Sequence, residues 1–514
     1  MGNGYLLGVD VGTYSSKGVL VDTGGEVVAT HAVPHGMDMP KPGHFEHDAD
    51  RVWWNDFREI VGNLLAKSGV RPGHILGIGT SAIGPCVLPL DGKGRPLRPG
   101  ILYGIDGRAS KDIDHLEKVL GREDIFQRSG THLDTQACGP KILWVRRNEP
   151  EIYAKTRWFL TSQAYLVYRL TGKVSIDNYS ASGYAPLFDI YRSEWYGDVA
   201  RHVTPVDLLP EITWSCDIAG EVTAEAALET GLARGTPVIT GTIDAAAEAI
   251  SAGVAEVGDM MCMFGSSIFF IMKTAKRVKT QHFWSANFLE PGTFAFMGGM
   301  STSGSLTTWF RDRFAQGEVA KEKSGGENAY TALARKAAQS PPGANGLIAL
   351  PYFEGERTPL HDPEAKGVLF GLGLTHTRGD IYRALLEGVG FGIRHNMEVM
   401  GKEGVTPERV IAVGGGTQNP LWMQLVADIA DVELVLHRRS VGASYGDAFM
   451  AGVGVGLFKD LGEITRWVGK GRAVTPNPEI HKRYASHYRI FRSLYDATQP
   501  LMRDLSNSFR SNGN

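Results

Sequence analysis

The chain has 514 residues, a length that favours two or more domains over a single core. Its composition is that of a globular protein, with 43% apolar and 21% charged residues, and its four scattered cysteines indicate neither a zinc knuckle nor a disulfide framework. Because 53 basic residues stand against 56 acidic ones, the formal charge is only −3, which gives no reason to expect a nucleic-acid or membrane partner.

The first predicted element is a β-hairpin at residues 5–22, where two apolar runs flank a Gly/hydroxyl turn. This strand begins without a basic segment or a cleavage site of a secretory signal, so we expect a cytoplasmic protein. The turn follows Asp10 and precedes Lys17. Its backbone N–H groups and hydroxyls suit phosphate oxygens, and the carboxylate suits Mg²⁺ held through water. The same pattern is also ordinary hairpin-turn chemistry, and this alternative stays open.

Strands and helices alternate over the next part of the chain. Helical spacing predicts helices near 49–68, 110–120 and 142–147, and apolar runs predict buried strands near 74–81 and 236–242. The second strand leads to Asp244 at the start of an alanine-rich helix. The small residues leave room for a ligand beside this carboxylate, although an aspartate there is also a common helix N-cap.

A second hairpin is predicted at residues 259–273, about half a chain after the first, with its turn at Gly265-Ser266. The two hairpins are consistent with a duplicated lobe or with two unrelated hairpins. Farther along, residues 379–401 and 481–506 have helical spacing, and 408–416 reads as a strand that ends in three glycines. These glycines would let a flat group lie against bare backbone, or would form a flexible turn. Strands interleaved with helices indicate the α/β class.

Several motifs occur together in one order along the chain. They are the turn at 10–17, the segments 139–149 and 241–247, Gly265-Ser-Ser267, the pair 355–359 and 366–367, Gly414-Gly-Gly416 with Asn419, and Gly446-Asp-Ala448. In this series the chain resembles the FGGY family of carbohydrate kinases, within the actin/Hsp70/hexokinase superfamily, and most of all its xylulokinases. The resemblance runs from about Tyr5 to Gly456.

The resemblance implies two ribonuclease-H-like (actin-like ATPase) domains that face each other across a deep cleft. Residues 1–247 would form the N-terminal, sugar-binding domain, and residues 248–514 the C-terminal, nucleotide-binding domain. A homodimer is among the oligomeric states that the family leaves open.

The implied reaction is ATP-dependent phosphorylation of a hydroxyl of a small carbohydrate, with Mg²⁺. Asp244 would be the general base, and Asp10 would hold the metal through water, with Asp244 beside it. Residues implied in binding the nucleotide and its phosphates are Thr13, Ser15, Lys17, Gly265, Ser266, Gly304, Gly414, Gly415 and Asn419.

The sugar side departs from the xylulokinase pattern. A Met-His pair is replaced by Ala82-Ile83, the W-N-D-G-R motif by residues 103–108, and the Asn after the base by Ala245. We expect Ala82, Ile83, Asp106 and Asp244 to line the sugar site, although Asp106 also fits a plain surface turn. The expected substrate is a ketopentose such as D-xylulose, and the alternatives are a ribulose, hexulose, erythritol or glycerol type of substrate. A non-catalytic ATP-binding protein of the actin/Hsp70 fold and a sugar-responsive repressor are the alternatives from other classes.

Overall fold

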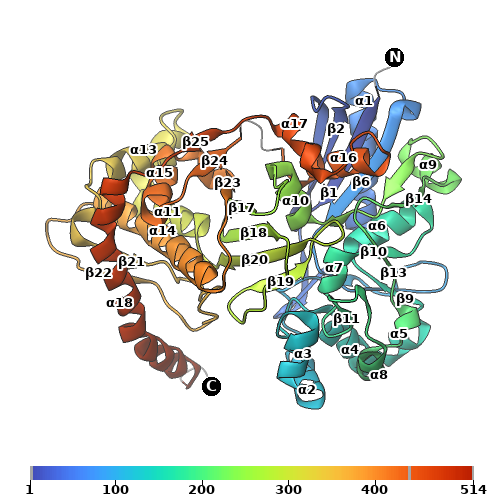
Figure 1. Ribbon diagram of the computed structural model, residues 1–514, viewed down its shortest axis with the longest axis horizontal. Coiled ribbons are helices and arrows are strands. Elements are labelled where there is room, and N and C mark those ends of the chain that lie inside the picture. Colours follow the sequence, from blue (N-terminus) through green and yellow to red (C-terminus); the bar gives the residue numbers. More distant parts are fainter. Residues whose placement is uncertain (1–3, 438–440, 512–514) are drawn as a thin grey trace. The chain divides into compact units, whose positions relative to one another are not determined.

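The computed structural model describes residues 4–437 and 441–511 (Figure 1). The chain divides into two compact units. Unit 1 comprises Met1–Val257, Lys273–Phe296 and Val441–Gly469, and unit 2 comprises Gly258–Met272, Met297–Ser440 and Lys470–Asn514. The chain is therefore an α/β protein of two domains, which confirms the predicted fold class. The boundary between residues 247 and 248 stays a prediction.

The main sheet of unit 1 contains the predicted N-terminal hairpin. Asp10 on β1 (Tyr5–Val11) is paired with Lys17 on the antiparallel β2 (Ser15–Asp22) and with Ser81 on the parallel β6 (Ile75–Ala82). Ser81 is in turn paired with Thr242 on the short strand β16. The sheet thus places Asp10, Ser81 and Thr242 side by side on three strands. In spatial order its strands are β14 (Ile218–Glu221), β15 (Pro237–Ile239), β6 (Ile75–Ala82), β1 (Tyr5–Val11), β2 (Ser15–Asp22) and β3 (Val27–Pro34), with β16 (Thr242–Ile243) beside β6.

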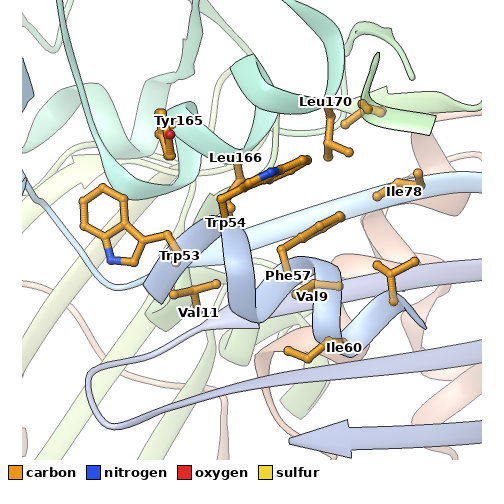
Figure 2. Packing of buried hydrophobic residues seen from close by; sticks show 14 of the residues in the cluster. Val9, Val11, Trp53, Trp54, Phe57, Ile60, Ile78, Tyr165, Leu166 and Leu170 are labelled. Atoms are coloured by element: carbon orange, nitrogen blue, oxygen red, sulfur yellow. The ribbon is translucent and has the colours of Figure 1, made fainter. Parts of the chain in front are cut away.

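Helices α1 (Asn55–Ser68) and α6 (Ser162–Thr171) close the core of unit 1 around the first strand (Figure 2). Trp53 and Phe57 are fully buried, and they lie close to Val9 and to Tyr165 in Figure 2. Full burial of one such side chain contributes on the order of 1.5–3 kcal/mol. The helix predicted at 49–68 is present, but its first turns, Ala49–Trp54, are π-helical, a form that is frequent near functional sites.

The remaining elements of unit 1 are short. Its other helices are α2 (Ser110–Leu120), α3 (Arg122–Ser129), α4 (Cys138–Asn148), α5 (Pro150–Lys155), α7 (Asn178–Ser182), α8 (Gly197–Val203), α9 (Ala224–Thr230), α10 (Asp244–Ala252), α16 (Ala443–Gly454) and α17 (Thr465–Val468). Its minor strands are β4 (Asp38–Lys41), β5 (His44–His47), β7 (Leu88–Leu90), β8 (Gly100–Ile101), β9 (Trp158–Leu160), β10 (Ser175–Asp177), β11 (Phe188–Asp189), β12 (Glu194–Trp195) and β13 (Glu211–Thr213).

Helix α16 comes from a late part of the chain and packs against β1, β6 and α10 of unit 1 (Figure 1). The approach is so close that glycine is required on both sides. A Cβ on Gly79 of β6 would lie 2.1 Å from the Asp447 carbonyl oxygen, and one on Gly446 would lie 2.1 Å from the Ala247 carbonyl oxygen. Real Cβ atoms do not approach so closely, so backbone packs directly on backbone here.

Unit 2 is organised around a second sheet that contains the other predicted hairpin, β17 and β18. Helix α14 begins at a capping box formed by Thr377 and Asp380, which explains its sharp start beside the predicted residue 379. In unit 2 the sheet order is β20 (Phe294–Met300), β18 (Ile268–Thr274), β17 (Asp259–Phe264), β23 (Arg409–Val413), β24 (Leu434–Leu436) and β25 (Arg472–Val474), whereas β19 (Trp284–Asn287) belongs to the segment Lys273–Phe296 of unit 1. The further elements are β21 (Ile348–Leu350), β22 (Val368–Phe370), α11 (Gly304–Phe314), α12 (Gln316–Lys323), α13 (Ala329–Ala338), α14 (Arg378–Lys402), α15 (Pro420–Ala430) and α18 (Pro478–Ser511).

Within residues 4–437 and 441–511, no helix is both long and apolar enough to cross a membrane.

Candidate active site

The turn between β1 and β2 forms one side of the candidate site in unit 1. The Gly12 N–H donates to the Ser15 carbonyl at 3.1 Å, which closes the turn. Thr13 Oγ1 lies 3.3 Å from the Tyr103 hydroxyl, and the Lys17 side chain is exposed. The predicted phosphate ligands Thr13, Ser15 and Lys17 therefore lie together on one hairpin, although their role stays a prediction.

Two histidines lie behind this turn. His35 Nε2 is 3.1 Å from the Gly12 carbonyl oxygen, and His35 Nδ1 is 2.7 Å from Asp56 Oδ2. The pKa of His47 is lowered to about 4, mainly by burial and then by His35, against the opposite effect of its hydrogen bond to the Thr13 backbone. The Gly12 carbonyl, and with it the backbone of the turn, is therefore held by a histidine side chain that is itself fixed by Asp56.

Asp244 is the first residue of α10, immediately after β16. Its Oδ1 accepts from the Ala245 N–H at 2.7 Å, so the carboxylate is fixed against the helix N-terminus. Burial and then the nearby Asp10 raise the pKa of Asp244 well above its usual range. The two carboxyl groups predicted to act together are thus close enough to influence each other's charge.

Two further carboxyl groups belong to this cluster. Burial and then Asp10 raise the pKa of Glu248, one turn after Asp244, to about 7. Burial and then Asp10 also raise the pKa of Asp447 on α16 well above its usual range. The pKa of Asp10 itself is raised by burial to about 6, against the effects of Ser81 and Lys17. Such shifts concentrate at functional sites, because burial and like charges are tolerated where they serve chemistry.

The predicted sugar ligands have different environments. Ala82 and Ile83 are 0% and 1% exposed, so they offer no surface to a sugar in this structure. Asp106 is completely buried, and its carboxylate accepts from the Phe45 N–H at 2.6 Å and from Arg108 Nη2 at 2.7 Å. The roles of these three residues as sugar contacts stay predictions. The ion pair explains why Asp106 is tolerated in the interior.

A buried lysine holds the loop that carries Tyr103. Lys141 Nζ donates to the Leu102 carbonyl at 2.6 Å and to the Tyr103 carbonyl at 2.8 Å, and burial lowers the pKa of this amine. Trp144, one turn later on α4, lies under the Arg108 guanidinium, 5.0 Å from its ring centroid. The motif at 139–149 therefore stabilises the loop whose tyrosine reaches Thr13.

Unit 2 contains a cavity of about 700 Å³ beside the second hairpin turn. The Gly304 N–H donates to the Gly265 carbonyl at 2.9 Å, which fixes this turn against the start of α11. The cavity is lined by both hydroxyls and aromatic rings, and its volume lies in the range of small-molecule and cofactor sites. Its lining is Phe264, Gly265, Ser266, Gly304, Thr307, Thr308, Asn328, Tyr330, Thr331, Ala334, Tyr382, Gly415, Gly416, Gln418, Asn419, Pro420 and Trp422.

The glycines after β23 have two separate tasks. Gly414 has a φ of +90°, and a Cβ there would lie 2.7 Å from the Phe264 carbonyl oxygen, so it serves the packing of the turn. Gly415 has open space where a Cβ would be, and it lines the cavity. Asn419 caps α15 by accepting from the Trp422 N–H at 3.2 Å. The structure thus gathers five of the predicted nucleotide residues, Gly265, Ser266, Gly304, Gly415 and Asn419, around one cavity.

Sequence reasoning missed several residues of this site. The sequence marks Tyr103 only as a departure from a motif, and it indicates no role for His35, Glu248 or Asp447. Asp447 alone carried a usable signal, because a carboxylate in the small-residue run Gly446-Asp-Ala448 is unusual for a tightly packed helix.

Two family models match the chain. The model described as "FGGY family of carbohydrate kinases, N-terminal domain" covers residues 5–251, and the model of the C-terminal domain covers 260–455. The chain is similar to the xylulose kinase of Bacillus subtilis (strain 168), with 29% identity over 99% of this chain and 100% of the relative. It is also similar to the ribulokinase of Anoxybacillus flavithermus (strain DSM 21510 / WK1), with 30% identity over 96% and 95% of the two chains. The crystal structure of xylulose kinase from Rhodospirillum rubrum has a TM-score of 0.89 and 31% identity over 97% of this chain and 100% of that one.

Proposed function

The chain belongs to the FGGY family of carbohydrate kinases, and from this we propose that it transfers the γ-phosphoryl group of Mg·ATP to a hydroxyl of a ketopentose, with D-xylulose as the leading substrate. The observation that carries the proposal is the placement of Asp244 beside Asp10 in unit 1, with a glycine-lined cavity in unit 2.

In the proposed reaction the sugar hydroxyl oxygen forms a bond to the γ-phosphorus while the bond from that phosphorus to the ADP oxygen breaks. Asp244 accepts the proton of the hydroxyl, and ADP leaves. Because the transition state of phosphoryl transfer is loose, orientation and charge stabilisation contribute more than the base. The role of the fixed Ala245 N–H bond is to keep the Asp244 carboxylate in one orientation.

The side chains of unit 1 fit a magnesium ion. Its carboxylate oxygens are the hard ligands that Mg²⁺ prefers, and this ion is usually bound by one or two carboxylates together with substrate phosphates. Asp10 and Asp244 would hold it. Burial raises the pKa of both carboxyl groups, and the charge of Asp10 raises that of Asp244 further, so a cation there would stabilise their ionised forms. When bound, the ion would neutralise charge on the phosphates.

The substrate is proposed from the relatives and from the site. Similarity to both a xylulose kinase and a ribulokinase supports a ketopentose. We propose that Tyr103 and the partly exposed Ala245 contact the sugar, because Ala245 follows Asp244 directly and the charge of Asp244 acts on Tyr103. Tyr103 replaces the first residue of the W-N-D-G-R motif, and Ala245 replaces the Asn expected of xylulokinases. A ribulose, hexulose, erythritol or glycerol type of substrate is therefore included in the test. The cytoplasmic location and the homodimer stay predictions.

The test is an ADP-release assay with Mg·ATP and a panel of ketoses and polyols. We expect turnover to depend on the sugar, and Asp244→Asn to lower it by at least ~10²-fold, the lower end for a lost general base. Asp198→Asn, an exposed aspartate on α8, is the matched control and should retain full turnover. Release of ADP that is equal with and without every sugar would contradict the kinase assignment, and near-normal turnover of Asp244→Asn would contradict the base.

A further inference from the structure

The motif Gly446-Asp-Ala448 contains a carboxyl group that the proposed reaction does not use. Asp447 is 0% exposed, on a helix that packs against the sheet through glycines. Its Oδ2 lies 2.7 Å from Ser81 Oγ, and the same Ser81 oxygen lies 3.1 Å from Asp10 Oδ1. One serine hydroxyl thus connects the buried aspartate to the proposed metal ligand.

Counting protons in this chain of three groups shows that one carboxyl group is protonated. A serine hydroxyl has one hydrogen, so it donates to one neighbour and accepts from the other. Two ionised carboxylates can only accept, and two such neighbours would leave one of these contacts without a proton. One of the two aspartates must therefore bring its own proton to Ser81.

The surroundings identify Asp447 as the protonated group. Its other oxygen, Oδ1, is buried and has no hydrogen-bond partner among the described residues. A buried carboxylate ion in that position would have no hydrogen bond to offset its lost hydration, whereas burial of a neutral carboxylic acid costs far less free energy. Burial and then the charges of Asp10 and Asp244 oppose ionisation of Asp447, and only the hydrogen bonds of Ser81 favour it. Asp10 by contrast is paired across the strands with Lys17, a cation.

We propose that Asp447 is a positioning residue which, as a neutral carboxylic acid, donates to Ser81 and so makes Ser81 donate to Asp10. The relay fixes the rotamer of the Asp10 carboxylate and occupies its Oδ1, which leaves Oδ2 as the oxygen that would hold Mg²⁺ through water. It also limits the negative charge of the cluster formed by Asp10, Asp244, Glu248 and Asp447. The inference rests on the proposed role of Asp10.

A direct test is infrared spectroscopy of the full-length enzyme without substrates, near neutral pH. The wild type minus Asp447→Asn difference spectrum should contain the carbonyl band of one protonated carboxyl group. Asp112→Asn is the control, because Asp112 is also a buried aspartate but forms an ion pair with Arg147 at 2.9 Å, and it should show no such band. Absence of the band in the Asp447→Asn spectrum would overturn the proposal. This readout does not depend on turnover, so it separates failure of the relay from failure of the proposed function.

Kinetics provide the second test. The amide of Asp447→Asn can still donate to Ser81, so this variant should retain turnover within ~3-fold. Asp447→Ala and Ser81→Ala should each lower kcat at least ~10-fold, because Asp10 is then misplaced. They should also need more Mg²⁺ for half-maximal activity, with an unchanged KM for sugar. In the Ser81→Ala background, Asp447→Ala should change kcat less than ~2-fold, because the relay is already broken. Additive losses, or a loss in Asp447→Asn as large as in Asp447→Ala, would refute the relay. If Asp447→Ala does not fold, the Asn and Ser81→Ala variants still decide between these results.

Discussion

Glu248 makes the stability of the ligand-free protein fall as the pH rises. Burial and then the nearby Asp10 raise its pKa from the ordinary value of 4.5 to about 7. The folded state therefore holds this proton more tightly than the unfolded state does. Its contribution to stability is complete below about pH 4.5 and is lost as the pH rises to about 7. Each tenfold change in proton affinity corresponds to ~1.4 kcal/mol of folding free energy. Because Glu248 is in partial contact with solvent, which weakens the effect, we expect the protein to lose about 2–3 kcal/mol of stability over this pH range.

The variant Glu248→Gln removes this loss while it keeps the size of the side chain and its bond from the Ala443 N–H. In a domain of this size, 1 kcal/mol of stability shifts the melting temperature by roughly 2 °C. We therefore expect the variant to melt about 5 °C above the wild type at about pH 8, and the two melting temperatures to converge near pH 5. Differential scanning fluorimetry over this range measures it, and Glu225→Gln, an exposed glutamate on α9, serves as the control. Parallel pH profiles for Glu248→Gln and the wild type would refute the reasoning.

Three further substitutions test the two units separately. Gly415→Val places a side chain in the open space of the unit 2 cavity. It should raise the KM for ATP at least ~10-fold and leave the sugar affinity, measured by calorimetry, unchanged. A normal KM for ATP would show that the nucleotide lies elsewhere. Lys141→Met removes the Lys141 donor from the buried Leu102 carbonyl and leaves the Tyr103 carbonyl with the Asp106 N–H, so it should cost about 1–3 kcal/mol of stability and raise the KM for sugar more than that for ATP. An unchanged melting temperature would argue against this role. Ala245→Asn should raise the kcat/KM for D-xylulose relative to other ketoses by up to ~10-fold, and ratios that do not move would mean that residue 245 does not face the sugar.

Local pattern was enough to predict the elements that carry the candidate site. Both hairpins, the strand at 75–82 and the helix after Asp244 lie where apolar periodicity and Gly/hydroxyl turns place them. The reason is that each of these signals is set by neighbours in the chain. The π-helical turns at Ala49–Trp54 could not be predicted in the same way, because tertiary packing of Trp53 and Trp54 decides them.

Contacts between segments that are distant in the sequence could not be predicted from local sequence patterns. Ser81 and Asp447 are separated by 366 positions, so nothing in the spacing of either segment indicates that they meet. In the same way, the sequence around Asp106 gives no sign that the Phe45 N–H, 61 positions away, occupies its carboxylate. The family resemblance supplied the order of the motifs but not these pairings.

The origin of α16 in the last quarter of the chain affects how the protein is made. During synthesis, β1 and β6 leave the ribosome early, but the helix that covers their glycine-rich face follows only after residue 443. Until then unit 1 has an uncovered sheet face, and closing it requires a contact of very long sequence separation, which slows folding. Nascent chains that end before residue 443 should therefore be the ones that bind chaperones and aggregate, whereas chains extended past residue 454 should resist protease.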